Sequence, residues 1–323
     1  MAAPGDPQAG QRDHLRLHRH RSDHQGPINA PLATTWAAIF YAMRCVTDPT
    51  IPSTEGCKRP FHIIAPPGRL VNAQKPAAVN QHMVVCHSLV DLVMGALATA
   101  VPERVMADSC GCLYNFTTAK QVATRQPVVF GEVVPGGLGA TARADGINVM
   151  SCHVTNCPIP PIEATEATEA ECPVLYLQRE LRTDTGGASE WRGGVGQVLA
   201  YRVLGDDGEL HHTSQKSESL PQGFAGAGPG DGGSWTVNTG LNDERVLAVS
   251  IGDLEHLQRG DTVTHRTPGG GGFGDPMRRD PARVIADFRA GLVTAEAAET
   301  LYGLRIDPAD PARWVPAGRR ART

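Results

Sequence analysis

The sequence predicts an α+β fold, in which an N-terminal helical part packs on a β-rich C-terminal part that ends in short helices. Apolar residues recur at helical spacing between residues 31 and 100. After residue 127, short apolar and β-branched runs alternate with clusters drawn from the 36 glycines and 25 prolines, which mark turns. The pattern divides the chain into a disordered tail, a mixed helical part, a β-rich part, C-terminal helices and a second tail: 1–25, 26–135, 136–276, 277–305 and 306–323.

The composition is that of a globular protein, with 41% hydrophobic and 20% charged residues among 323. A net charge of −4 argues against nucleic acid or an anionic membrane as a partner. No window reaches the roughly 18 apolar residues of a membrane span, and the N-terminus lacks the apolar core of a secretory signal. The eight cysteines are therefore expected to be reduced, and the chain to be cytoplasmic.

The helical part begins at Pro31, a residue that suits a first helical turn, and its apolar spacing predicts a helix over 31–46. A short strand is predicted at 61–64. Pro76 then opens a long predicted helix that runs to about residue 100, where Pro102 follows.

The β-rich part contains a series of short predicted strands separated by glycine clusters. They are predicted at 128–130, 147–155, 174–181, 195–204, 211–216, 235–237, 245–249 and 262–267. Near the end, Asp280 is placed to cap a helix that reaches about residue 290, and Thr294 is placed to cap another that ends at Tyr302. Gly303 follows at the position where glycine commonly closes a helix.

His153 lies in one of the predicted strands, and Glu163 and Glu166 follow it after a proline-rich turn. An imidazole with two carboxylates can ligate a divalent metal or carry out acid–base chemistry. The alternative is a structural histidine that bonds a loop carbonyl. The chain has neither a Gly-x-Ser-x-Gly motif nor a His-Glu-x-x-His motif, which excludes the common serine hydrolases and zinc proteases.

Two glycine-rich segments allow close approach of backbone or of a phosphate: 136–140, followed by Asp145, and 267–276. The second segment lacks the Lys-Ser/Thr of a phosphate-binding loop, and Asp275 would repel an anion. The first is not followed by the helix of a dinucleotide-binding motif. A tight structural crossing of the chain is the favoured interpretation of the second segment.

Several blocks, taken together and in order, resemble the hydantoinase B/oxoprolinase family. This family contains the B-type subunits of ATP-dependent hydantoinases and 5-oxoprolinases and is related to subunits of acetone and acetophenone carboxylases. The resemblance covers about residues 26–304. The matching blocks are 26–30, 58–60, 136–146, 153–156, 163–166, 186–196, 268–276, 291–293 and 302–303.

The resemblance implies an enzyme subunit that acts on a cyclic amide together with an A-type partner, which uses ATP with Mg²⁺ to phosphorylate the amide oxygen. It implies catalytic roles for His153, Glu163 and Glu166. The residues implied in substrate or backbone loops are Gly137, Gly139, Asp145, Asn156 and Arg192. Two alternatives stay open, which are a subunit of an ATP-dependent ketone carboxylase and an inactive fragment that keeps only a subunit-contact surface.

The sequence departs from the family pattern at two places. It resembles only the C-terminal part of longer members, and their metal-binding segment has no counterpart, so no metal is expected on this chain. Ser151 stands where members commonly carry a second histidine. The basic, histidine-rich run at 14–24 can be interpreted as a metal-binding tract or as a solvated tail. A one-base shift of its coding sequence would restore a family-like segment, which leads to the hypothesis that residues 1 to about 25 are translated out of frame.

Overall fold

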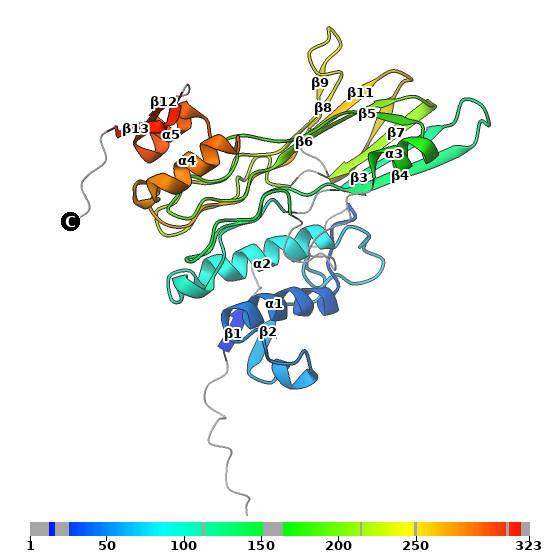
Figure 1. Cartoon of the computed structure of the whole chain (residues 1–323). Helices are drawn as coiled ribbons and strands as arrows, with labels where there is room; N and C mark the ends of the chain where they lie inside the picture. The colour runs from blue at the N-terminus through cyan, green and yellow to red at the C-terminus, as the bar shows by residue number, and fades with distance from the viewer. Residues whose placement is uncertain are drawn as a thin grey trace, which may run out of the picture. The chain divides into compact units, whose positions relative to one another are not determined.

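The computed structural model describes residues 13–16, 26–111, 114–150, 164–213, 215–248, 251–307 and 310–317. The chain divides into two compact units, residues 1–93 and 94–323 (Figure 1). Among the described residues, no helix is both long and apolar enough to cross a bilayer.

The first unit is built around helix α1 (Leu32–Val46) and most of helix α2 (Met83–Leu97), with the 3-10 turn η1 (Glu55–Lys58). The expected helix over 31–46 is confirmed, with Pro31 in an extended conformation at its N-cap. Its buried face carries Ala38, Ile39 and Ala42. The thiol of Cys86 on α2 lies 3.8 Å from the carbonyl oxygen of Thr34, which links the two helices.

The second helix begins at Met83, seven residues later than the expected start at Pro76. The preceding segment is held by residues earlier in the chain. The amide of Gln81 donates to Pro27 O at 2.9 Å, and the side chain of Asn29 donates to Ala78 O at 3.0 Å. These long-range bonds replace the first turns of the expected helix.

A short strand, β1 (Asp13–Arg16), pairs in parallel with β2 (Phe61–Ile64), so part of the expected N-terminal tail is in register with a strand. The other residues of 1–25, including most of the histidine-rich run and the segment of the out-of-frame hypothesis, lie outside the described residues.

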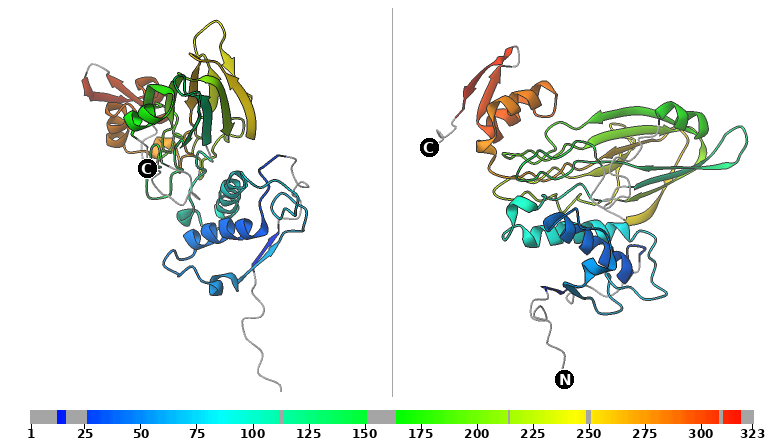
Figure 2. Two further views of the ribbon diagram at one scale, coloured as in Figure 1. Left: turned by 90° about the vertical axis from the view of Figure 1, so that its right-hand side faces the viewer. Right: turned by 60° about the horizontal axis from the view of Figure 1, so that its bottom comes forward.

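The two larger sheets of the second unit, among the described residues, are both antiparallel (Figures 1 and 2). The four-stranded sheet has the order β10-β7-β3-β4, with bounds Ile251–Leu257, Asp206–Thr213, Tyr114–Lys120 and Pro127–Val133. The five-stranded sheet has the order β5-β6-β11-β8-β9, with bounds Val174–Leu181, Gln197–Val203, Thr262–Arg266, Ser234–Val237 and Arg245–Val246. Helix α3 (Thr165–Glu171) lies against β5.

The sheets form a sandwich because both contribute side chains to one core. Phe130 of β4 meets Tyr201 of β6 edge to face at 5.6 Å between ring centroids. The hydroxyl groups of Thr117 on β3 and Tyr201 are hydrogen-bonded at 2.7 Å. This pairing satisfies a buried phenol that would otherwise be costly to bury.

The chain ends in helices α4 (Pro281–Arg289) and α5 (Ala295–Tyr302), preceded by η3 (Pro276–Arg278). The expected caps are confirmed: Asp280 accepts from the amide of Ala282, Thr294 accepts from the amide of Ala297, and Gly303 has a left-handed φ of 61°. The expected tail from 306 is corrected, because β12 (Leu304–Asp307) pairs with β13 (Asp310–Pro316).

Other expectations also need correction. The mixed helical part is expected to extend to residue 135, but β3 and β4 belong to the sandwich. Within the strand predicted at 147–155, Met150 makes only an isolated bridge to Gly136, and residues 151–155 lie outside the described part. Strands β3 and β10 were not predicted. The η2 turn (Pro102–Arg104) follows α2 near its expected end.

Candidate functional site

Extended, glycine-rich segments lie side by side where the sandwich ends, because β11 continues directly into 267–274 and β6 follows directly after 193–196. The segments are joined by backbone hydrogen bonds. The amide of Gly137 donates to Pro268 O at 2.9 Å, that of Gly194 to Leu138 O at 2.8 Å, and that of Gly270 to Gly194 O at 2.8 Å. We call this arrangement of 134–140, 185–196 and 267–274 the glycine crossing.

The glycines of the crossing are required by steric contact. A Cβ atom added at Gly137 would lie 2.0 Å from Gly194 O, and one at Gly139 would lie 1.9 Å from Ala107 O. The obstacle is backbone in both cases, so no side chain can move aside. The structure thus places two of the residues implied in backbone loops, Gly137 and Gly139, within the crossing.

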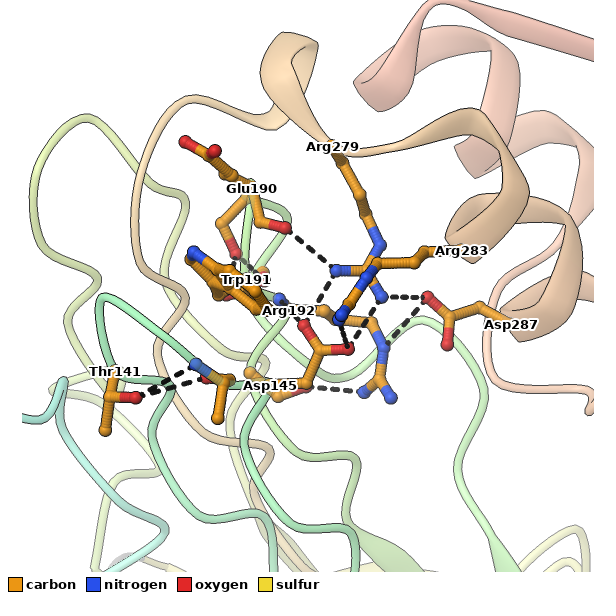
Figure 3. A network of polar contacts seen from close by, with 12 residues as sticks. Thr141, Asp145, Glu190, Trp191, Arg192, Arg279, Arg283 and Asp287 are labelled. Carbon is orange, nitrogen blue, oxygen red and sulfur yellow. Dashed lines mark hydrogen bonds and ion pairs between the residues drawn. The ribbon is translucent and has the colours of Figure 1, made fainter.

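A network of charged side chains lies beside the glycine crossing, with the partly buried Asp145 at its centre (Figure 3). Arg279 holds the carboxylate with two hydrogen bonds, of 2.7 Å from Nη1 and 3.0 Å from Nη2. The same guanidinium donates to Asp287 Oδ2 at 2.6 Å and to the carbonyl of Glu190 at 3.0 Å. The Arg279 side chain is only 1% exposed.

Arg192 joins this network from the glycine crossing. Its amide donates to Asp145 Oδ1 at 2.8 Å, and its Nε lies 3.3 Å from Asp287 Oδ2. Its Nη1 donates to Asn148 Oδ1 at 3.2 Å. Asp145 and Arg192, both implied in substrate loops, are therefore brought together, and Arg192 is buried.

The outer side of the network is formed by Arg283, whose guanidinium lies over the Trp191 ring at 4.5 Å from the centroid. Its Nη1 lies 3.4 Å from Asp145 Oδ2. We call Asp145, Arg192, Arg279, Arg283 and Asp287 the Asp145 network; it contains three guanidinium groups and two carboxylates.

The electrostatics of the network fix its protonation state. Burial alone would raise the pKa of Asp145, but the hydrogen bonds and positive charge of Arg279 outweigh it, so the pKa lies below its ordinary value. Burial would lower the pKa of Arg279, but Asp145 and Asp287 reverse the effect and raise it. Asp145 is therefore a carboxylate at neutral pH, with its oxygens occupied by donors.

An ionised carboxylate whose oxygens already accept hydrogen bonds is a poor general acid or base, because it must first lose those hydrogen bonds. What the Asp145 network can do is join three segments of the chain: the loop around Asp145, the segment that carries Arg192, and helix α4 with the residues before it. The arrangement fits the positioning of loops better than direct acid–base chemistry.

The candidate catalytic residues lie elsewhere or outside the described part. Glu166 is exposed in the first turn of α3. Figure 1 and the right-hand view of Figure 2 place α3 and α4 at opposite ends of the second unit, so the structure does not bring Glu166 to the Asp145 network. His153, Asn156 and Glu163 lie in 151–163, outside the described residues.

Sequence reasoning missed Arg279 and Asp287. A signal for Asp287 was present, because it lies three residues after Val284 and so shares the buried side of helix α4. A charged residue on the buried stripe of an amphipathic helix indicates a buried ionic partner. No comparable local signal marks Arg279, which lies in a turn.

The described residues do not form a metal site: none of their histidine, cysteine, aspartate and glutamate side chains gather in a group of three or more suited to a metal ion. His153 and Glu163 are not among these residues, because 151–163 lie outside the described part.

Comparison with known proteins identifies relatives over most of the chain. Residues 10–276 match the model of the family described as hydantoinase B/oxoprolinase. A relative from Pseudomonas sp. (strain NS671), named as the B-type subunit of a D-/L-hydantoinase, is 30% identical over 286 residues, covering 87% of this chain and 47% of the relative.

Two solved structures have a similar fold. The ATP-dependent caprolactamase from Pseudomonas jessenii gives a TM-score of 0.79 at 28% identity, covering 93% of this chain and 53% of that one. The nucleotide-free acetone carboxylase gives a TM-score of 0.76 at 19% identity, covering 94% of this chain and 45% of that one. This chain thus spans about half the length of these three relatives.

Proposed function

Because the chain belongs to the hydantoinase B/oxoprolinase family, we propose that it acts as the B-type subunit of an ATP-dependent amidohydrolase that opens a cyclic amide, such as a hydantoin or 5-oxoproline. The observation that carries the proposal is the match to an ATP-dependent caprolactamase at 28% identity over 93% of the chain. Both this enzyme and the hydantoinase relative are named for substrates with an amide in a ring.

The chemistry explains the need for two components. A cyclic amide resists attack by water because its carbonyl is stabilised by the nitrogen lone pair. Phosphorylation of the carbonyl oxygen by ATP removes this stabilisation and makes the ring carbon electrophilic. Water then adds to the ring carbon, the ring C–N bond breaks with the nitrogen leaving as the amine, and a second water hydrolyses the resulting acyl phosphate to the carboxylate and phosphate. In the proposal, an A-type subunit carries ATP with Mg²⁺ and transfers the phosphoryl group, while the B-type chain positions water at the ring carbon. A reaction that consumes ATP also fits a cytoplasmic location.

Within this chain, we assign water activation to His153 and Glu163, with Glu166 as a third candidate. A histidine near carboxylates is suited to take a proton from water. The Asp145 network and the glycine crossing are assigned a positioning role, because their polar atoms are already bonded to one another.

The proposal is tested by purifying the chain alone, an A-type subunit alone, and the two together. ATP hydrolysis is measured with hydantoin, 5-oxoproline or caprolactam, and ring-opened product is measured in parallel. We expect lactam-dependent ATP hydrolysis only when both chains are present. The A-type subunit alone is the control for its own background hydrolysis.

Two results would contradict the proposal and separate it from the alternatives. ATP hydrolysis that requires a ketone and bicarbonate would indicate a carboxylase subunit. Formation of a stable complex without turnover of any lactam would indicate that this chain supplies a contact surface only. The fold likeness to acetone carboxylase does not favour the carboxylase, because at 19% identity it reports the fold alone.

A further inference from the structure

Three aromatic side chains meet in the interior of the sandwich: His212 of β7, Trp235 of β8 and His265 of β11. The rings of Trp235 and His265 are stacked, with centroids 3.7 Å apart and planes inclined by 9°. The His212 ring lies 5.6 Å from that of Trp235. All three residues are at most 2% exposed. We call this group the histidine stack.

The strand register explains the stack and its position. His265 lies directly opposite Trp235 in the antiparallel pair of β11 and β8, where side chains on one face are in contact. His212 belongs to β7, in the other sheet. The stack therefore joins the two sheets of the sandwich.

Within the described part of the chain, the groups that face His265 offer no compensation for a positive charge. The charged and titratable groups that act on it are His212 from β7 and Arg182 just beyond β5. Its neighbour on β6 is Leu199, and Trp235 on β8 is likewise not titratable.

Two carboxylates of the second unit are paired with arginines. Arg182 donates to Asp231 at 2.6 Å. At the edge formed by β4 and β5, Glu132 is bonded by Arg179 at 2.5 Å. His265 Nδ1 and Trp235 Nε1 are buried, and neither has a hydrogen-bond partner among the residues that the structure describes. Burial holds the pKa of His265 well below its usual value, and the electrostatic influence of His212 and Arg182 acts in the same direction.

We propose that the histidine stack is an acid-sensitive latch between the two sheets, which holds while His265 is neutral and weakens when His265 takes up a proton. A protonated imidazole would be a buried cation without a paired carboxylate, and such a charge is strongly disfavoured. The chain relieves this cost by opening the sandwich so that water reaches the ring.

The direction of the pH dependence follows from the two states. In the unfolded chain a histidine has a pKa of about 6.5, whereas folded His265 stays neutral to a lower pH. Above pH ~6.5 neither state binds the proton, and the latch contributes fully. Below that pH the unfolded state binds one proton more than the folded state, so the folding equilibrium constant falls by up to about tenfold per pH unit. The fall ends once folded His265 is itself protonated.

The test is urea unfolding of the whole chain at a series of pH values between about 5 and 8. The wild type is compared with His265→Gln and His265→Phe, which cannot take up this proton. The matched control is His256→Gln, which removes an exposed histidine from β10 of the same sandwich. We expect the control to show the same dependence of stability on pH as the wild type. In the two His265 variants, the number of protons taken up on unfolding below pH ~6.5 should be smaller by about one.

A second measurement applies if the His265 variants do not fold. The ring ¹H–¹³C signals of the 12 histidines are followed in the folded wild type as the pH is lowered. The proposal expects at least one ring to remain neutral well below pH ~6.5. The proposal is overturned if every histidine ring titrates at about pH 6.5. It is also overturned if the free energy of unfolding of the wild type is the same above and below pH ~6.5, or if folded His265→Gln shows the same dependence of that free energy on pH as the wild type.

Discussion

Arg279 donates two hydrogen bonds to the carboxylate of Asp145, although the two residues are 134 positions apart in the sequence. The pair fastens the loop that follows one glycine segment to the turn that precedes helix α4. Because the Arg279 side chain is 1% exposed, its charge needs compensation, which Asp145 and Asp287 supply. The contact is therefore a requirement of the fold at the site where the glycine segments cross.

The first prediction concerns this pair. Asp145→Ala leaves Arg279 buried with one carboxylate fewer, and we expect a loss of about 3–5 kcal/mol in the free energy of unfolding. Urea unfolding at neutral pH measures it. The control is Glu299→Ala, which breaks the exposed pair with Arg305 and should cost at most about 1 kcal/mol. Equal losses for the two variants would contradict the central role of the Asp145 network.

The contrast between Asp145 and the helix caps shows what could be predicted from the sequence. Asp280, Thr294 and Gly303 act on residues within a few positions of themselves, so their roles follow from local spacing. The partner of Asp145 depends on how distant segments fold together. The family resemblance implied that Asp145 and Arg192 each lie in substrate or backbone loops, but it could not indicate Arg279.

The missed strands have a related explanation. Strand β3 is the polar sequence Tyr114–Lys120, and its register with β4 and β7 makes it a central strand. Its burial comes from these partners rather than from its own composition. The late start of α2 is similar, because bonds from Gln81 and Asn29 to distant partners override the helical spacing.

A second prediction tests the glycine crossing. Gly137→Ala places a methyl group 2.0 Å from Gly194 O, and because the obstacle is backbone, we expect a loss of about 3 kcal/mol or more. For a unit of this size the melting temperature should fall by roughly 6–12 °C. Gly95→Ala is the control, because its nearest neighbour is the tip of Phe224 at 3.8 Å and alanine favours the helix. A stable Gly137→Ala chain would refute the close crossing.

A third prediction uses acid pH. The pKa of Asp145 is lowered in the folded chain, so its stabilisation is complete above the ordinary value near 4 and is lost as the pH falls toward the folded pKa. The difference in stability between the wild type and Asp145→Asn should therefore be largest near neutral pH and shrink below pH ~4. Unfolding curves of both proteins at matched pH values measure it. A difference that stays constant with pH would show that the charge of Asp145 does not contribute.

A fourth prediction concerns the cap of α5. The hydroxyl of Thr294 accepts from the amide of Ala297 at 3.1 Å and donates to Asp184 at 2.7 Å. Thr294→Ala removes both contacts and should cost about 1–2 kcal/mol of stability, whereas Thr294→Ser should cost much less because serine keeps the hydroxyl. Thermal unfolding of the two variants provides the comparison, and similar losses would argue against the cap.

The last prediction concerns the proposed catalytic residues and is measured with the chain paired to an A-type subunit. If His153 activates water, His153→Ala should lower turnover of a cyclic amide by ~100-fold or more, in the range of general acid–base contributions, with little change in melting temperature. His256→Ala, on an exposed position of β10, is the control for loss of a histidine as such. Glu166→Gln is informative because Glu166 is exposed in the first turn of α3, so a loss of turnover there would not be explained by a damaged core. A lower melting temperature with near-normal turnover for His153→Ala would assign that residue a structural role, since a group that moves protons affects the reaction before it affects the fold.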